Sequence, residues 1–289
     1  MIADDTFQRF VFDELNIRGE WVRLSESFQQ ATQETDYPPA IKALLGQTIA
    51  ASVLLTGTLK FAGSLSIHAR GEGPVSLLMA EATDRRTFRG IAKWLADAGA
   101  AIDSSDALAQ LLGDAQLAIT INPVAGTRYQ GVVPLERDSL DACLAHYFEL
   151  SEQLDTYLLL VADSVNCYGL MLQKLPGHDV EDDQDAWNRI VQLAKTLSIE
   201  EFKSNDNETL LTRLFHEEHV ISFAKEVVKF ECSCSRARSL ASIKNLGSDD
   251  ALRLLEQEAT ISVDCQFCCK HYEFDRDDIT TLFELGSRH

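Results

Sequence analysis

The chain has 289 residues, more than a single hydrophobic core usually holds, so we expect a main domain accompanied by one or more smaller units. Its formal net charge is −19 at pH 7, with 26 basic and 45 acidic residues. No part of the chain carries the basic surplus that binding to a phosphate backbone requires, which argues against a nucleic-acid-binding protein.

Residues 1–178 predict an α+β domain in which strands and helices mix. Alternating side chains over residues 7–24, broken at Gly19, indicate two strands around a turn. The prolines of YPP favour the start of a helix that continues through ALLGQTIAASVLLTGT. Residues 64–84 predict two strands joined at Gly71 to Pro74. Further strands are predicted within residues 87–94, 117–136, 156–164 and 168–176. Helices are predicted at residues 104–113 and 139–154.

The apolar helix does not predict a membrane protein. Its uncharged run is slightly shorter than the ~20 apolar residues that span a bilayer. It also contains Gln47, Thr48 and Ser52, and its apolar residues recur at helical spacing, as in a core helix. The first ten residues lack the basic start and apolar run of a secretory signal, so we expect a cytoplasmic protein.

Residues 179–231 predict a metastable helical linker. After the acidic run HDVEDDQDAW, apolar residues recur on one face of a predicted amphipathic helix: Trp187, Ile190, Val191, Ala194 and Leu197. NETLLTRLF indicates a second short amphipathic helix. Isolated helices this short are marginal in water, so we expect the linker to depend on docking to its neighbours.

Residues 232–289 predict a small zinc-binding domain and hold five of the seven cysteines. Residues 239–247 and 248–259 read as short helices, the second capped by Ser248, and 260–265 and 270–274 read as strands. So few residues rarely form a self-sufficient core, and a bound metal is the usual remedy.

Four cysteines of this segment form the candidate site. Cys232 and Cys234 form a CxC motif, and 30 residues later Cys265 and Cys268 form a CxxC motif. Residues i and i+2 of an extended strand face the same side, and a CxxC turn also gathers its two sulfurs. Four thiolates match the tetrahedral site that zinc prefers, so we predict one Zn²⁺ per chain. The alternatives are a disulfide pair and an iron–sulfur cluster, which also uses four thiolates.

The spacing alone leaves the role of this site open. The simplest alternative is a protein-binding module with a static structural zinc ribbon. The other interpretation is a switch, because oxidants attack thiolates, disulfide formation would eject the metal, and a small domain without its metal unfolds. A thiol–disulfide oxidoreductase is a third alternative, but no thioredoxin-like βαβ pattern surrounds the CxxC. No catalytic triad or paired-carboxylate arrangement can be assembled from sequence order, and we do not expect an enzyme.

Several other motifs have ordinary explanations. HEEH at 216–219 spaces its histidines at i and i+3, whereas zinc proteases need i and i+4. RGEGPV lacks the Lys and Ser/Thr of a phosphate loop and reads as a hairpin turn. Cys143 and Cys167 read as core thiols, and His271 as a residue outside the ligand set. Arg236, Arg238 and Lys270 either offset the negative charge of the metal site or are surface cations.

CSC, the 30-residue gap and CQFC followed by KHYEF resemble the zinc motif of the thirty-three-kilodalton heat-shock protein family, the redox-regulated holdase chaperones. RGEWVRL, YPPAIKALLGQTIAASVLLTGTLKFAG, RYQGVVPL, YFELSEQLDTYLLL and LMLQKLP resemble its amino-terminal domain, so the resemblance covers nearly the whole chain. It implies that the reduced, zinc-loaded protein is inactive. Oxidation would pair Cys232 with Cys234 and Cys265 with Cys268, release zinc, unfold the linker and allow binding of unfolded or oxidatively damaged client proteins without ATP, with the active form a homodimer.

The chain departs from the family at Cys269, where glycine usually follows the CxxC. Glycine there suits a turn with positive φ, in which a residue with a Cβ is strained. Cys269 could compete for zinc or form a wrong disulfide. We interpret it as a tolerated neighbour and retain Cys268 as the ligand.

Overall fold

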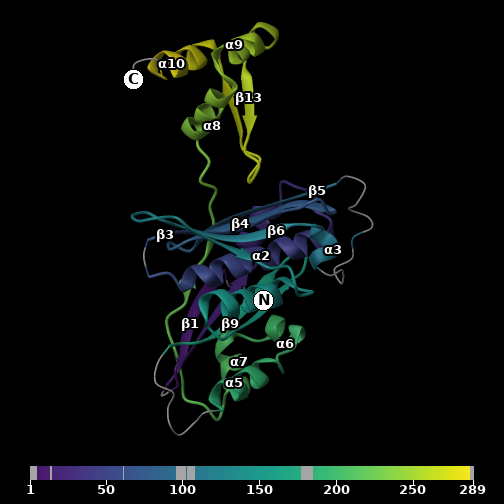
Figure 1. Ribbon diagram of the computed structural model, residues 1–289, viewed down its shortest axis with the longest axis vertical. Helices are drawn as coiled ribbons and strands as arrows, with labels where there is room; N and C mark the ends of the chain where they lie inside the picture. Colours follow the sequence, from purple (N-terminus) through teal and green to yellow (C-terminus); the bar gives the residue numbers. More distant parts are fainter. Residues whose placement is uncertain are drawn as a thin grey trace. The chain divides into compact units, whose positions relative to one another are not determined.

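The computed structural model describes residues 5–13, 15–60, 62–95, 102, 108–176 and 185–286. By its internal contacts the chain forms two compact units, Met1–Glu231 and Cys232–His289 (Figure 1). Sheets and helices are mixed in both, which confirms the predicted α+β class.

The first sheet of the large unit is antiparallel and has the strand order β10-β1-β2-β9-β8, with β11 also paired to β1. Its strands are β1 (Thr6–Phe12), β2 (Ile17–Leu24), β8 (Thr156–Ala162), β9 (Cys167–Lys174), β10 (Val220–Ser222) and β11 (Glu226–Val227). The two strands predicted around a turn are β1 and β2, but the chain turns between Phe12 and Ile17 and not at Gly19, where the alternation breaks. Gly19 lies inside β2 beneath the ring of Phe10, where a Cβ would come within 2.0 Å of that ring. Close packing, rather than a turn, explains this break in the alternation.

The second sheet has the strand order β12-β5-β4-β3-β6-β7. It comprises β3 (Gly63–Arg70), β4 (Val75–Thr83), β5 (Thr87–Trp94), β6 (Gln116–Pro123), β7 (Tyr129–Val133) and β12 (Lys229–Phe230). The predicted turn at Gly71 to Pro74 joins β3 to β4, which confirms that RGEGPV is a hairpin connection.

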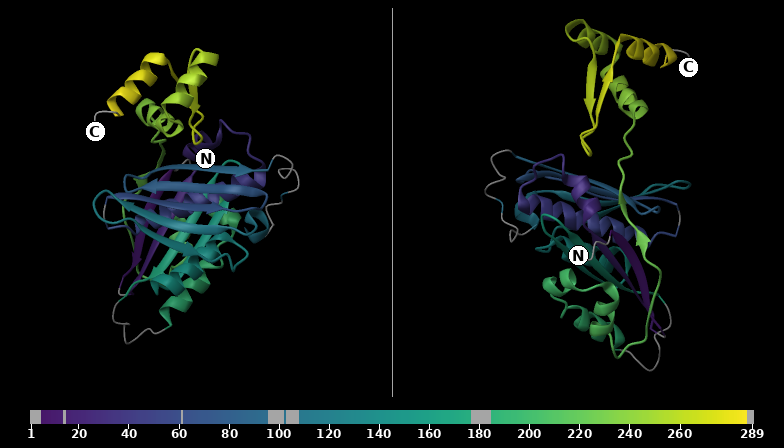
Figure 2. Two further views of the ribbon diagram at one scale, coloured as in Figure 1. Left: turned by 45° about the horizontal axis from the view of Figure 1, so that its top comes forward. Right: turned by 180° about the vertical axis from the view of Figure 1, so that it is seen from behind.

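The helix α2 (Pro39–Gly57) lies between the two sheets and forms the centre of the main core (Figure 2). By length and composition α2 could cross a membrane, but most of it is buried inside the unit. Its buried hydroxyl groups are satisfied within the helix, since Thr48 Oγ1 donates to the Leu44 carbonyl and Ser52 Oγ to the Ile49 carbonyl. The prediction of a core helix is confirmed.

Shorter helices complete this core: α1 (Glu26–Thr32), α3 (Leu108–Leu112) and α4 (Leu140–Tyr147), the last continued by a π-helical turn at Phe148–Glu152. The helix predicted at 104–113 is present from Leu108, and its first predicted residues, 104–107, lie outside the described residues.

The linker region contains α5 (Ala186–Ala194), α6 (Ile199–Ser204) and α7 (Asn207–Leu214). They pack on the face of the first sheet opposite α2 and form a second core there. In this core, Phe202 of α6 contacts Trp21 of β2, which in turn stacks on Phe10 of β1. α6 was not expected from the sequence; Ser198 and Glu201 close a capping box at its start. The helices thus dock as predicted, whereas the metastability of residues 179–231 stays a prediction.

Residues 220–230, which we call the strap, follow these helices and carry β10, β11 and β12. β10 and β11 run antiparallel to β1, and β12 runs parallel to β5 (Figure 2, right). The strap therefore joins an edge of the first sheet to an edge of the second.

The small unit contains a hairpin of β13 (Ile261–Asp264) and β14 (His271–Phe274) together with α8 (Arg236–Ile243), α9 (Ser248–Gln257) and α10 (Arg276–Gly286). Its few buried apolar residues, such as Ile243, Ala251 and Phe274, form a separate core. The Ser248 cap predicted for α9 is wrong: Gly247, with φ +85°, occupies the cap position, and Ser248 donates its hydroxyl to Asp249. α10 was not predicted.

Candidate metal centre

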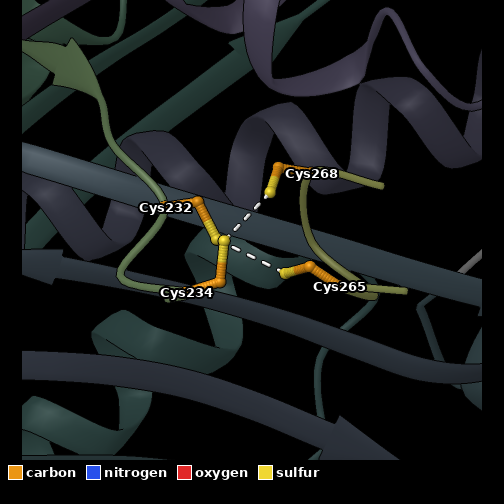
Figure 3. A group of neighbouring side chains, drawn as sticks. All are labelled: Cys232, Cys234, Cys265 and Cys268. Carbon is orange, nitrogen blue, oxygen red and sulfur yellow. Dashed lines mark hydrogen bonds between the residues drawn. The ribbon is translucent and has the colours of Figure 1, made fainter. Parts of the chain in front are cut away.

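The structure brings together the sulfur atoms of all four predicted ligands. Cys232 and Cys234 lie in the extended segment before α8, and Cys265 and Cys268 lie in the turn between β13 and β14. The four Sγ atoms all lie within 4.8 Å of one another (Figure 3). In the described part of the chain, no other group of three or more metal-ligating side chains meets the same condition.

The sulfur separations fit a tetrahedral metal ion. The Sγ–Sγ distance is 3.6 Å between Cys232 and Cys265, and 3.4 Å between Cys234 and Cys268. Four sulfurs at Zn–S distances of about 2.3 Å would be about 3.8 Å apart. No disulfide links them. The soft, all-sulfur donor set is the one that Zn²⁺ takes in closed structural sites, and these residues fit that ion.

The hairpin turn places Cys268 toward the cluster and leaves Cys269 outside it. The Cys269 amide donates to the Cys265 carbonyl at 2.8 Å, and the Cys265 amide donates to the Lys270 carbonyl at 3.0 Å. Cys269 has φ +54°, as predicted for the position that glycine occupies in the family. Its side chain is exposed.

Tyr272 gives one thiol a distinct acidity. Its hydroxyl donates to Cys234 Sγ at 3.2 Å. Burial raises the pKa of Cys234, but the hydrogen bonds from Tyr272 and from the neighbouring thiols outweigh burial and lower this pKa to about 7. Burial raises the pKa of both Cys232 and Cys268 above the usual thiol value. A metal ion must therefore displace the protons of Cys232 and Cys268, so its affinity rises with pH.

The nearby cations have structural partners. Arg236 Nη1 donates to the Glu273 carbonyl at 2.6 Å, and its guanidinium lies 4.6 Å from the centre of the Phe274 ring. Arg238 Nη1 donates to the carbonyl of Ser233, between the two cysteines of the CxC motif, at 2.9 Å. Arg238 thus positions the CxC backbone. The Lys270 ammonium lies 5.5 Å from the centre of the Tyr272 ring.

Other candidates from the sequence lie elsewhere. His271 Nδ1 bonds to Asp264 at 2.6 Å and belongs to no metal-ligating group among the described residues. In HEEH, His219 pairs with Asp13 at 2.9 Å and forms no such group there either. Cys143 and Cys167 are fully buried, which raises the pKa of both thiols, and they are core residues as predicted. No sequence pattern indicates the role of Tyr272, because its hydrogen bond to Cys234 depends on how β14 lies beside the CxC segment.

Comparisons with known proteins agree with this architecture. The family model described as "Hsp33 protein" matches residues 5–275. A "33 kDa chaperonin" from Hahella chejuensis is 49% identical over 288 residues, covering 99% of each chain, and one from Ectopseudomonas mendocina is 46% identical over 284 residues, covering 97% of this chain and 95% of that one.

A solved structure of the 33 kDa chaperonin (heat shock protein 33 homolog) from Thermotoga maritima has the same fold. The TM-score is 0.80, with 99% of this chain and 100% of that chain covered, although only 21% of residues are identical. From the family match over nearly its whole length and the close relatives, the chain belongs to the Hsp33 protein family.

Proposed function

We propose that the chain is an ATP-independent chaperone, a holdase, whose activity the four-cysteine cluster controls. The names of its relatives support a chaperone role. The observation that carries the regulatory part is the cluster itself, because four thiols within 4.8 Å suit both a metal ion and disulfide formation. The reduced form holds one Zn²⁺ through Cys232, Cys234, Cys265 and Cys268 and does not bind clients.

Oxidation would convert the site by two local reactions. In each, two thiolates lose two electrons and form one disulfide, while hypochlorous acid takes up the electrons and a proton and leaves as chloride and water. Pairing Cys232 with Cys234 and Cys265 with Cys268 consumes all four ligands and releases zinc. The small unit then loses the roughly 10–16 kcal/mol that structural zinc can supply to folding, and the linker follows.

The unfolded linker and the uncovered large unit would bind unfolded or oxidatively damaged proteins in the cytoplasm, with the active form a homodimer. The net charge of −19 keeps such a form soluble while it exposes apolar surface. Neither a nucleic acid nor a membrane takes part in this scheme, and it has no catalytic step.

The test combines zinc content, free-thiol count and light scattering of an aggregating client, before and after hypochlorous acid. We expect one zinc and four thiols to be lost together, and aggregation to be suppressed only after oxidation. Cys269→Ser is the matched control, since it removes an adjacent thiol outside the cluster and should leave all three readings of the switch intact. Equal suppression by the reduced and oxidised forms would overturn the proposal.

Mapping the disulfides sharpens this test. The closest sulfur contacts join the two motifs, Cys232 to Cys265 and Cys234 to Cys268, whereas the proposal requires disulfides within each motif. Peptide mapping of the oxidised chain should find disulfides within each motif. Disulfides that join the two motifs would contradict the proposal. If zinc instead stays bound under mild oxidant, the site is a static zinc ribbon in a protein-binding module.

A further inference from the structure

The strap is the outermost strand on both sheets of the large unit. Along β1, Phe12 pairs with Val220 and Phe7 with Glu226; along β5, Phe88 pairs with Phe230. Backbone hydrogen bonds continue between and beyond these pairs, from the Val228 amide to the Asp5 carbonyl at 2.8 Å and from the Glu231 amide to the Phe88 carbonyl at 3.0 Å. One extended segment thus covers an edge of each sheet, and without it both edges would expose unpaired backbone groups.

Few side chains of the strap are buried. Val228 is 1% exposed and belongs to the main core, whereas its neighbour Val227 is 62% exposed. Ile221 and Phe223 are also exposed. The strap is therefore held mainly by backbone pairing and by a small number of side-chain contacts, a mode of binding that many sequences can satisfy.

One of these contacts selects for charge. Glu226 Oε1 lies 3.2 Å from Arg9 Nη2, and Glu226 Oε2 lies 2.9 Å from Arg86 Nε. Arg86 is itself mostly buried, with its guanidinium 3.9 Å from the centre of the Phe7 ring. Arg9 on β1 and Arg86 in the turn between β4 and β5 thus bind one carboxylate, two residues before the buried Val228.

We propose that the strap occupies the site where a client polypeptide binds. Once the strap detaches, an extended segment of an unfolded protein adds to β1 and β5 in its place, with an acidic side chain between Arg9 and Arg86 and an apolar side chain in the position of Val228. The strap ends two residues before Cys232, so unfolding of the small unit removes the anchor at its end. This inference rests on the proposed function and names the partner's binding site.

The experiment uses the full-length chain and a fluorescent peptide, VISFAKEVVKFE, that copies residues 220–231. A photo-crosslinking group replaces the Phe230 side chain. We expect the peptide to bind the oxidised, zinc-free chain at least tenfold more tightly than the reduced, zinc-loaded chain. Crosslinks should fall on β5 around Phe88, which pairs with Phe230 in the intact strap.

Neighbouring valines provide the matched control. Val228→Thr in the peptide should weaken binding about tenfold, since a hydroxyl would enter an apolar core position. Val227→Thr, the same change at an exposed position, should alter binding less than threefold. Glu226→Gln should also weaken binding, and added salt should reduce the difference between it and the unmodified peptide.

The results separate this inference from the proposed function. The oxidised chain could suppress client aggregation while the peptide fails one of its tests: it does not bind, it binds the reduced chain equally, it crosslinks away from β5, or the two valine changes weaken its binding equally. Any of these results would show that the proposed site is wrong and would leave the chaperone role intact. If the peptide binds as expected, an excess of it should also reverse the suppression of aggregation. An oxidised chain that suppresses no aggregation would instead contradict the function itself.

Discussion

Cys269 has a backbone conformation that favours glycine, and this strain can be relieved. At φ +54° a Cβ costs about 1 kcal/mol, so Cys269→Gly should stabilise the zinc-loaded small unit by about that amount. Cys269→Ser keeps the Cβ and should give no such gain. Denaturant unfolding of the small unit, followed together with zinc content, tests both variants.

Zinc content also shows whether Cys269 is a metal ligand. Both Cys269 variants should retain one zinc per chain, whereas Cys268→Ser should bind zinc far more weakly in a chelator competition. Loss of zinc from both Cys269 variants would show that Cys269, rather than Cys268, is a ligand.

Glu20 on β2 is a buried carboxylate whose two oxygens accept no hydrogen bond within the described part of the chain. Burial raises its pKa from 4.5 to about 7, although the charges of Arg18 and Arg86 lower it. The folded state therefore binds this proton more tightly than the unfolded state. This group's contribution to stability is greatest below pH 4.5, falls as the pH rises to about 7, and is constant above that.

Glu20→Gln tests this dependence, because glutamine imitates the protonated acid. The variant should be more stable than the original chain at pH 8, by up to about 3 kcal/mol, and should match it near pH 4.5. Urea unfolding of the large unit at both pH values gives the comparison. A difference that is the same at both pH values would contradict the buried-charge explanation.

At the scale of elements, a buried polar network fastens the linker helices to the first sheet. Asn207, at the start of α7, accepts from Arg23 Nε at 2.6 Å and donates to Gln8 Oε1 at 2.8 Å. Gln8 in turn donates to the carbonyl of Phe223 in the strap at 3.0 Å. One network thus joins β1, β2, α7 and the strap.

Asn207→Ala should loosen this attachment by about 2–3 kcal/mol, since it removes the two hydrogen bonds that Asn207 makes with the buried side chains of Arg23 and Gln8. Thr212→Ala, an exposed change on the same helix, is the control. Hydrogen exchange of residues 185–215 should accelerate in the first variant and not in the second. Equal exchange in the two would mean that apolar packing alone holds the helices.

At the scale of the whole molecule, the two units should respond differently to removal of the metal. The small unit has only a limited apolar core, whereas the large unit has two extensive ones. A chelator under reducing conditions should therefore abolish hydrogen-exchange protection of β13 and β14 while α2 and β9 remain protected. The four-serine variant at Cys232, Cys234, Cys265 and Cys268 should behave in this way without a chelator. Persistent protection of the hairpin in that variant would show that zinc is not required for its fold.

Local sequence patterns predicted much of this molecule. The apolar run of α2, the turn at Gly71 to Pro74 and the spacing of the CxC and CxxC motifs each depend on residues close together in the chain. The positive φ of Cys269 was expected from the family resemblance, because glycine usually follows the CxxC there. Local reasoning failed where a neighbour far along the chain decided the outcome, as at Gly19, which is glycine because the ring of Phe10 covers it.

The sequence by itself determined the chemistry of the cysteine cluster, since ligand type and motif spacing are properties of short segments. Only the tertiary structure decided that Tyr272 reaches Cys234, that Glu20 is buried, and that the strap joins β1 to β5. These arrangements bring together segments far apart in the chain. Their stability comes from burial and hydrogen bonding between those segments, and neither is encoded in the local pattern of any one of them.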